Sequence, residues 1–219
     1  MSKKRLRAII FGPQGSGKGT QGQLLSDKFN LPLIGSGVLF RNEMTKGTSL
    51  GKIAEEYVKS GCLAPDELVN GIMAHQLKAL NLKNGFLLDG YPRTVDQANF
   101  LQRILPINCA IYLKISDDEA VRRLLSRIQC PECKTVYNLV EAPPAQEGIC
   151  SVCGGHLHRR EDDTEDAIRT RLTNYHFMTE PLARYYRQKG ALLMIKGDQS
   201  IEYVHEVLMK KLAKLGFTP

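Results

Sequence analysis

The stretch GPQGSGKGT, residues Gly12 to Thr20, decides the fold of this chain. It follows the short β-rich run Leu6–Phe11 and precedes a segment with helical periodicity, so it joins a buried strand to a helix. In that position glycines let the backbone curl until successive N–H groups point at phosphate oxygens, and the helix N-terminus adds partial positive charge. The stretch therefore predicts a P-loop that binds a nucleoside triphosphate.

Two side chains of this loop have the chemistry to act on the phosphates directly. We expect the ammonium of Lys18 to reach the terminal phosphates, and the hydroxyl of Thr20 to approach Mg²⁺. A glycine-rich turn without function is the alternative, and the strand–loop–helix context argues against it. The positions expected to bind the triphosphate are Gly12, Gly15, Ser16, Gly17, Lys18, Gly19 and Thr20.

The rest of the chain alternates short apolar runs with helical patterns. Further strands are predicted at residues 85–89, 109–115 and 191–195, with a shorter one at 31–34. Helical patterns lie at residues 50–60, 66–80, 95–105, 117–127, 164–189 and 201–215. This alternation predicts an α/β fold in which a parallel five-stranded sheet is covered by helices on both faces.

Composition and charge limit the class of protein. The chain has 219 residues, of which 42% are hydrophobic and 24% charged, so it can bury a core without disulfides. We read no membrane span and no signal peptide in it, and expect a cytoplasmic protein. The net charge of +7 favours anionic partners, but it does not separate nucleotides from nucleic acid or a membrane surface.

Four of the six cysteines form two C-x-x-C pairs, Cys130/Cys133 and Cys150/Cys153. In a reducing compartment such pairs favour a metal site over disulfides, and four thiolates can surround one ion tetrahedrally. Zinc is the default ion, although iron also suits thiolates, and paired redox centres are the competing interpretation. The site has no open coordination position, which predicts a structural role. The surrounding segment 130–158 is rich in turn signals and is interpreted as a small inserted domain.

Two motifs together resemble one known family. Gly19 stands where most P-loops carry Ser or Thr, and this G-x-x-G-x-G-K-G-T form resembles the nucleoside monophosphate kinases. The run LDGYPRT, residues 88–94, followed by Gln97, is similar to the LDG[FY]PR signature of adenylate kinases. The resemblance extends over essentially the whole chain. It implies Mg²⁺-dependent phosphoryl transfer from ATP to AMP, giving two ADP and maintaining adenine nucleotide balance.

The resemblance also implies a role for individual residues. Asp89, at a strand end, is placed to hold water on Mg²⁺, Arg93 offers a planar fork for phosphate, and Gln97 can pair with an adenine edge. The catalytic set implied is Lys18, Asp89, Arg93, Arg127, Arg160 and Arg171. ATP would be bound by the loop with Arg123, Arg127 and Gly197, and AMP by Ser36, Arg41, Gly90, Arg93, Gln97, Arg160 and Arg171.

The same resemblance divides the chain into three parts. The P-loop core would comprise residues 1–34, 66–126 and 164–219, and the mobile AMP-binding lobe residues 35–65. Residues 127–163 would form the lid, whose thiolates Cys130, Cys133, Cys150 and Cys153 bind structural Zn²⁺. We expect a monomer with ATP and AMP or ADP as partners, and neither nucleic acid nor a membrane.

Two alternatives remain open at this point. A kinase for UMP or CMP would share the P-loop, although Gln97 and the long metal-bearing lid favour AMP, because the pyrimidine-directed relatives usually have short lids. A P-loop protein that binds nucleic acid through a zinc ribbon would leave residues 88–93 unexplained. Moreover, Tyr137 is the single aromatic residue between the two cysteine pairs, and no basic run accompanies it.

The chain departs from the family pattern at four positions. Gly35 and Ser36 take the places of the usual Ser and Thr, and Ile128 that of a second Arg after Arg127. Val38 stands where the family has an Asp whose carboxylate helps to order the hydration shell of Mg²⁺. His176, in the helical pattern after the lid, is interpreted as a packing residue rather than a catalytic one.

Restoring that carboxylate with Val38→Asp is expected to alter the Mg²⁺ dependence of turnover. The measurement is a Mg²⁺ titration of the initial rate for the two proteins, with Val38→Asn as the uncharged control. Identical titration curves for the original chain and the Asp variant would contradict this prediction.

Overall fold

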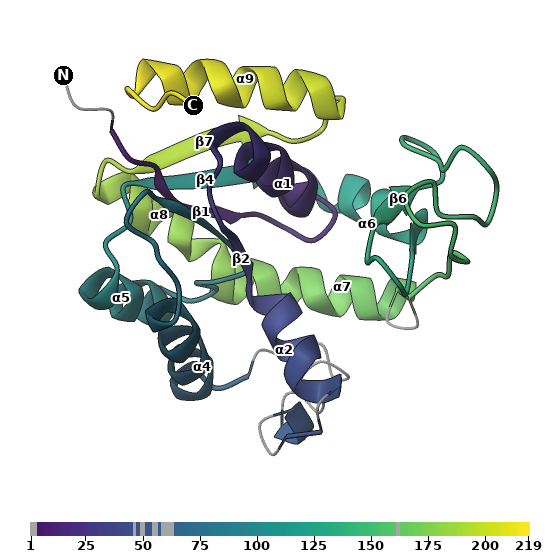
Figure 1. Ribbon diagram of the computed structural model, residues 1–219, viewed down its shortest axis with the longest axis horizontal. Helices are drawn as coiled ribbons and strands as arrows, with labels where there is room; N and C mark the ends of the chain where they lie inside the picture. The colour runs from purple at the N-terminus through teal and green to yellow at the C-terminus, as the bar shows by residue number, and fades with distance from the viewer. Residues whose placement is uncertain (1–3, 46, 49–50, 54–56, 58–63, 161–162) are drawn as a thin grey trace.

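A computed structural model describes residues 4–45, 47–48, 51–53, 57, 64–160 and 163–219. In Figure 1 a central sheet lies between two groups of helices, and the segment with the cysteine pairs projects at one end beyond helix α6 (Asp117–Leu125). Among the described helices, none is both long enough and apolar enough to cross a lipid bilayer.

The sheet confirms the predicted architecture. Its five strands run parallel in the order β2-β3-β1-β4-β7. They are β1 (Arg7–Phe11), β2 (Leu33–Gly35), β3 (Phe86–Asp89), β4 (Cys109–Lys114) and β7 (Leu192–Lys196). The predicted strand at 31–34 is shifted by a few residues, while the other four strands agree closely. Because all five strands are parallel, their carboxyl ends meet at one edge of the sheet.

Helices cover both faces of the sheet, as its nearly continuous apolar strands require. On one face α1 (Lys18–Phe29) and α9 (Ile201–Lys214) pack against alternate residues of the strands, with Leu25 and Leu208 at the centre. On the other face α4 (Asp66–Lys78), α5 (Val95–Ile104) and α8 (Pro181–Gln188) bury Met73, Leu101 and Tyr186. Figure 1 shows these two layers above and below the strands.

Two helical predictions need correction. The pattern at 117–127 ends as helix α6 at Leu125, and Arg127 instead opens strand β5 (Arg127–Gln129). The pattern at 164–189 is divided into α7 (Glu165–Asn174), a π-helical turn (Tyr175–Thr179) and α8. The division follows from Pro181, which has no amide hydrogen for the regular α-helical hydrogen bond to the carbonyl four residues back. In the turn before it, the N–H of Glu180 bonds the Tyr175 carbonyl five residues back at 2.9 Å.

The segment expected to form an AMP-binding lobe is described in part. Helix α2 (Ser36–Thr45) forms its first part, and residues 51–53 and 57 are helical within the pattern predicted at 50–60. The other residues of that pattern, and Cys62, lie outside the described residues. The predicted boundaries of this lobe stay a prediction.

The inserted segment forms a small unit of its own. Strand β5 pairs in antiparallel fashion with β6 (Val136–Asn138), and a single bridge from Gln129 to His158 extends the pairing. Helices α6 and α7, which enter and leave the segment, pack through Leu124, Ile168 and Leu172. The insert is therefore built on two helices that anchor it to the sheet.

The π-helical turn carries an ionic contact whose strength depends on pH. His176 lies 2.8 Å from Glu180 and 2.9 Å from Asp117 of α6. The hydrogen bond to Glu180, followed by the one to Asp117, raises the pKa of this imidazole above its usual value. Its stabilising effect is therefore complete below about pH 6.5 and is lost as the pH rises through the raised folded-state pKa.

We predict that His176→Gln lowers the free energy of unfolding by at most about 1 kcal/mol at about pH 5.5, because all three side chains are partly exposed and solvent screens them. The loss should shrink toward about pH 9, where the imidazole is neutral. Urea denaturation at the two pH values measures both quantities. The exposed His75→Gln serves as control, and a loss that does not change with pH contradicts the prediction.

Candidate active site

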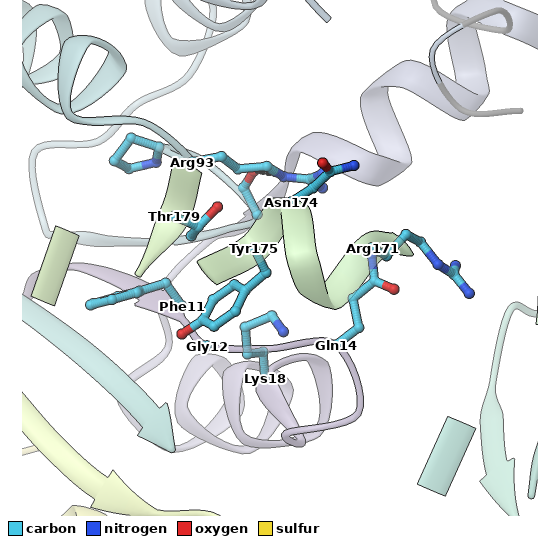
Figure 2. Close-up of a pocket in the computed structure, with 11 residues that line it drawn as sticks. Phe11, Gly12, Gln14, Lys18, Arg93, Arg171, Asn174, Tyr175 and Thr179 are labelled. Atoms are coloured by element: carbon cyan, nitrogen blue, oxygen red, sulfur yellow. Dashed lines mark hydrogen bonds between the residues drawn. The ribbon is translucent and has the colours of Figure 1, made fainter. Parts of the chain in front are cut away.

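Five of the predicted residues meet in one cavity at the carboxyl edge of the sheet. Lys18 comes from the loop after β1, Arg93 from the segment after β3, and Arg171 from α7. The cavity is open to solvent, and Figure 2 shows these side chains around it. Gly12 and Gly90 also line it, together with Gln14 and Tyr175, which were not among the predicted binding positions.

The loop of Gly12 to Thr20 has the backbone geometry that phosphate binding requires. Gly12 and Gly15 have φ angles of 151° and 81°, and a Cβ on Gly12 would lie 2.2 Å from the carbonyl oxygen of Leu113. Any other residue at position 12 would therefore clash with β4. Helix α1 begins directly at Lys18, so its N-terminal N–H groups face the loop.

The charges at this edge are desolvated and close together. Burial lowers the pKa of Lys18 to about 8, and burial also raises the pKa of Asp89 although Lys18 and Arg93 oppose that change. Lys18, Arg93 and Arg41 all act electrostatically on Asp89. The Lys18 ammonium donates a hydrogen bond to the carbonyl of Pro13 at 2.7 Å. With these three cations around a single carboxylate, the geometry favours an anionic ligand.

A second cavity lies on the other side of the loop. It is lined by Gly17, Thr20, Arg123 and Gly197, all of them predicted ATP-binding positions, and by Ser16. The hydroxyl oxygen of Ser16 is buried without a hydrogen-bond partner, which is a costly arrangement unless a ligand supplies one. Ser16 therefore fits the predicted role of the loop as a ligand site.

Arg123 is fixed at the wall of this second cavity. Its guanidinium pairs with Glu119 at 2.6 Å and donates to the Gly197 carbonyl at 2.8 Å, so two predicted residues far apart in sequence lie in contact. Glu141 of the insert approaches the same guanidinium at 3.3 Å. No motif in the sequence pointed to Glu141.

The remaining predicted arginines gather where the insert joins the core. Arg127 makes a two-bonded ion pair with Asp163 at 2.8 and 2.6 Å, and Arg171 reaches the same carboxylate at 3.1 Å. Arg160 donates to Gln129 of β5 at 2.6 Å. Among the residues that the structure describes, Arg171 lines the central cavity whereas Arg127 and Arg160 do not. Asp162, the residue before Asp163, lies outside the described residues.

The predicted AMP-binding residues lie around the loop after β3. The buried hydroxyl of Ser36 donates to the carbonyl of Gly90 at 2.7 Å, and Arg93 donates to the same carbonyl at 2.8 Å. Arg41 lies one turn along α2, next to Gly37. Gln97 is only 1% exposed, and its amide bonds protein groups rather than facing the open cavity. Sequence reasoning did not identify its partner, Asp66.

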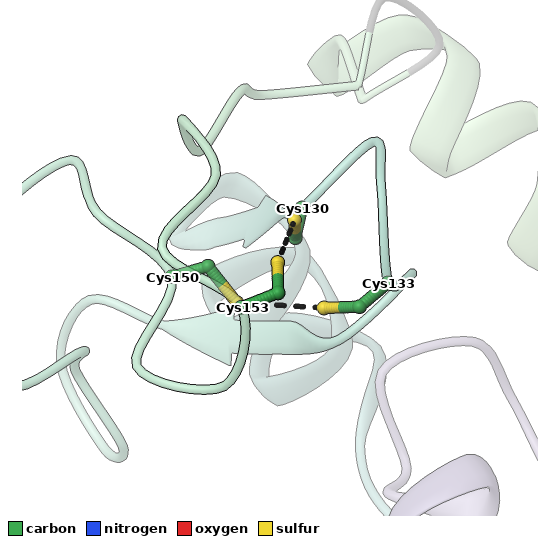
Figure 3. Close-up of side chains that lie close together, drawn as sticks. All are labelled: Cys130, Cys133, Cys150 and Cys153. Carbon is green, nitrogen blue, oxygen red and sulfur yellow. Dashed lines mark hydrogen bonds between the residues drawn. The ribbon is translucent and has the colours of Figure 1, made fainter.

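The four cysteines of the insert come together as predicted (Figure 3). All four sulfur atoms lie within 4.8 Å of one another, with 3.4 Å between Cys130 and Cys153 and 3.5 Å between Cys133 and Cys150. Thiolates held tetrahedrally at about 2.3 Å from Zn²⁺ are about 3.8 Å apart. The arrangement therefore fits one thiolate-bound metal ion, and zinc suits this donor set.

Comparisons with known proteins agree with the geometry. A model of the adenylate kinase family matches residues 10–191. A relative from Desulfitobacterium hafniense, named adenylate kinase, is 43% identical over 204 residues, which cover 91% of this chain and 94% of the relative. Relatives of the same name from Archaeoglobus fulgidus and Caldicellulosiruptor saccharolyticus are each 40% identical, over 96% and 94% of this chain and 99% of their own length.

We predict that Cys133→Ser abolishes stoichiometric zinc binding and lowers Tm by about 5–10 °C, since a chain of this size loses about 2–4 °C per kcal/mol. Metal content per chain and thermal denaturation measure the two effects. Cys109→Ala is the matched control, because Cys109 lies buried in β4 away from the cluster and should leave the metal content unchanged. Unchanged metal content in Cys133→Ser contradicts the prediction.

Proposed function

Because the chain belongs to the adenylate kinase family, a family of phosphotransferases, we propose that its reaction takes place in the cavity lined by Lys18, Arg93 and Arg171. The single observation that carries this proposal is the convergence of three cationic side chains from three separate segments on one cavity beside a P-loop. ATP would place its phosphates on the loop of Gly12 to Thr20, and AMP would approach from the side of Arg93.

The chemistry needs positioning and charge rather than a general base. The attacking oxygen of the AMP phosphate is already ionised, so the protein has to bring two polyanions together in line. Lys18, with the N–H groups of the loop, would hold the donor phosphates, and Thr20 and Asp89 would hold Mg²⁺ and its water. When bound with ATP, Mg²⁺ neutralises part of the charge that develops on the phosphates.

The acceptor would be held by a second group of residues. Arg41 and Arg93 are proposed to bind the AMP phosphate, with Ser36 and Gly90 shaping the loop beneath it and Gln97 pairing with the adenine. The remaining arginines, proposed to stabilise the moving phosphoryl group, are Arg123, Arg127, Arg160 and Arg171. Asp163 pairs with both Arg127 and Arg171 and offsets one of their two positive charges, and nucleotide phosphates would replace it as their partner.

The lid is proposed to exclude water from this chemistry. Closure of residues 127–163 over the bound nucleotides would strengthen each charge interaction and prevent transfer of the phosphoryl group to water. Zn²⁺ on Cys130, Cys133, Cys150 and Cys153 would hold the lid in shape without taking part in the reaction, which the closed set of four thiolates supports.

The cellular setting is also a proposal. Paired C-x-x-C units used as metal ligands are typical of a reducing compartment, and this supports a cytoplasmic location. We propose that the protein acts there as a monomer on ATP, AMP and ADP, with neither nucleic acid nor a membrane as partner.

The decisive variant for the proposed site is Arg93→Ala. It removes one oriented cation from the cavity and should lower turnover of ATP with AMP by about 10²-fold or more. Formation of ADP, followed by separation of the nucleotides, measures the rate. Arg103→Ala removes the same charge from the exposed side of α5 and should leave the rate unchanged. Equal rates for the two variants would place the reaction elsewhere.

A further inference from the structure

A buried hydrogen-bond network surrounds the side-chain amide of Gln97. Its Nε2 donates to Oδ1 of Asp66 at 2.7 Å, and its Oε1 accepts from the backbone N–H of Arg93 at 2.7 Å. Thr94 donates to the other carboxylate oxygen of Asp66 at 2.6 Å, while its own hydroxyl accepts from the N–H of Gln97. The network thus joins the first turns of α4 and α5 to the loop that carries Arg93.

The chemistry of the two partners fixes which way the amide points. The N–H of Arg93 is only a donor and must face the oxygen of Gln97. The carboxylate of Asp66 is only an acceptor and must face the nitrogen. Rotating the amide by 180° would place its oxygen against the carboxylate of Asp66, two acceptors, and its NH2 group against the N–H of Arg93, two donors. Such a reversal leaves buried groups unpaired, which costs about 1–3 kcal/mol for each.

A fixed amide can discriminate between purines in a way that a rotating one cannot. Adenine presents an acceptor, N1, beside its exocyclic amine, whereas guanine presents N1–H beside the O6 acceptor, so the order is reversed. A primary amide has two N–H donors and two oxygen lone pairs, and the network of Gln97 uses one of each. One donor and one acceptor of known order remain for a base. A freely rotating amide would suit either purine.

We propose that Asp66 is a positioning residue that fixes the polarity of the Gln97 amide and thereby selects adenine over guanine as the acceptor base. The inference rests on the proposed function, since it assumes that Gln97 pairs with the acceptor base. Asp66 would act through Gln97 and would not itself touch the nucleotide. Gln97 is covered in this structure, so the base would reach it when the side chains above it move aside.

The position of Asp66 suits this task. It lies in the first turn of α4, where the partial positive charge of the helix N-terminus favours a carboxylate. Asp66 also follows directly after the segment 35–65 that is proposed to bind AMP. Its contact with Gln97 therefore joins two helices of the core, α4 and α5, beside that segment. Glu67, the following residue, shares that helix turn but is exposed, and it provides a matched control.

The test is the ratio of kcat/KM for AMP to kcat/KM for GMP. Asp66→Asn offers the amide of Gln97 a donor as well as an acceptor, so the backbone N–H of Arg93 is then the one group of this network that opposes its reversal. Reversal costs less in this variant, and the ratio should fall by about 10-fold or more. Asp66→Ala removes the acceptor and should lower the ratio in the same direction. Glu67→Gln removes the same charge from the same helix turn and should keep the ratio of the unmodified chain.

Two results would overturn the inference. One is an unchanged ratio in either Asp66 variant that melts cooperatively like the unmodified chain. The other is a loss of rate by the same factor for both acceptors, which is what a merely structural role predicts. Failure of the proposed function is separate, because it would appear in the unmodified chain as no ADP formation from AMP.

Discussion

The desolvated charges at the carboxyl edge of the parallel sheet are the constraint on which the rest of the structure depends. Lys18 and Arg93 lie there with a single carboxylate, Asp89, between them, and burial disfavours the charged form of each. Such a cluster is poorly compensated until an anion enters. The parallel topology creates it, because the strands ending at Phe11 and Asp89 are neighbours and deliver their following loops to one place.

The insert and helix α7 add further cations to those at the carboxyl edge of the sheet. Asp163 holds Arg127 and Arg171 together, so two cations lie close to the place where the negative charge of the phosphates is proposed to arrive. A metal ion bound by the four thiolates would give the insert rigidity that its short strands cannot provide.

Much of this could be predicted from sequence, because the signals are local. The loop from Gly12 to Thr20 and the two cysteine pairs carry their chemistry within a few residues, and the structure and the related adenylate kinases agree with both. The π-helical turn was missed because Pro181 interrupts a helical pattern without ending it. The contact of Asp66 with Gln97 joins residues 31 positions apart, and no local pattern announces it. Individual roles of the arginines stay predictions.

The central claim is that donor and acceptor phosphates meet over Lys18 and Arg93. It is tested most directly by calorimetric titration with one molecule in which two adenosines are joined through five phosphates. The account predicts one such molecule per chain, bound at least about 100-fold more tightly than ATP or AMP alone, because linking the two halves makes the second binding event intramolecular. It also predicts that both nucleotides compete with it. Binding no tighter than that of ATP, or binding that AMP fails to displace, would contradict the account.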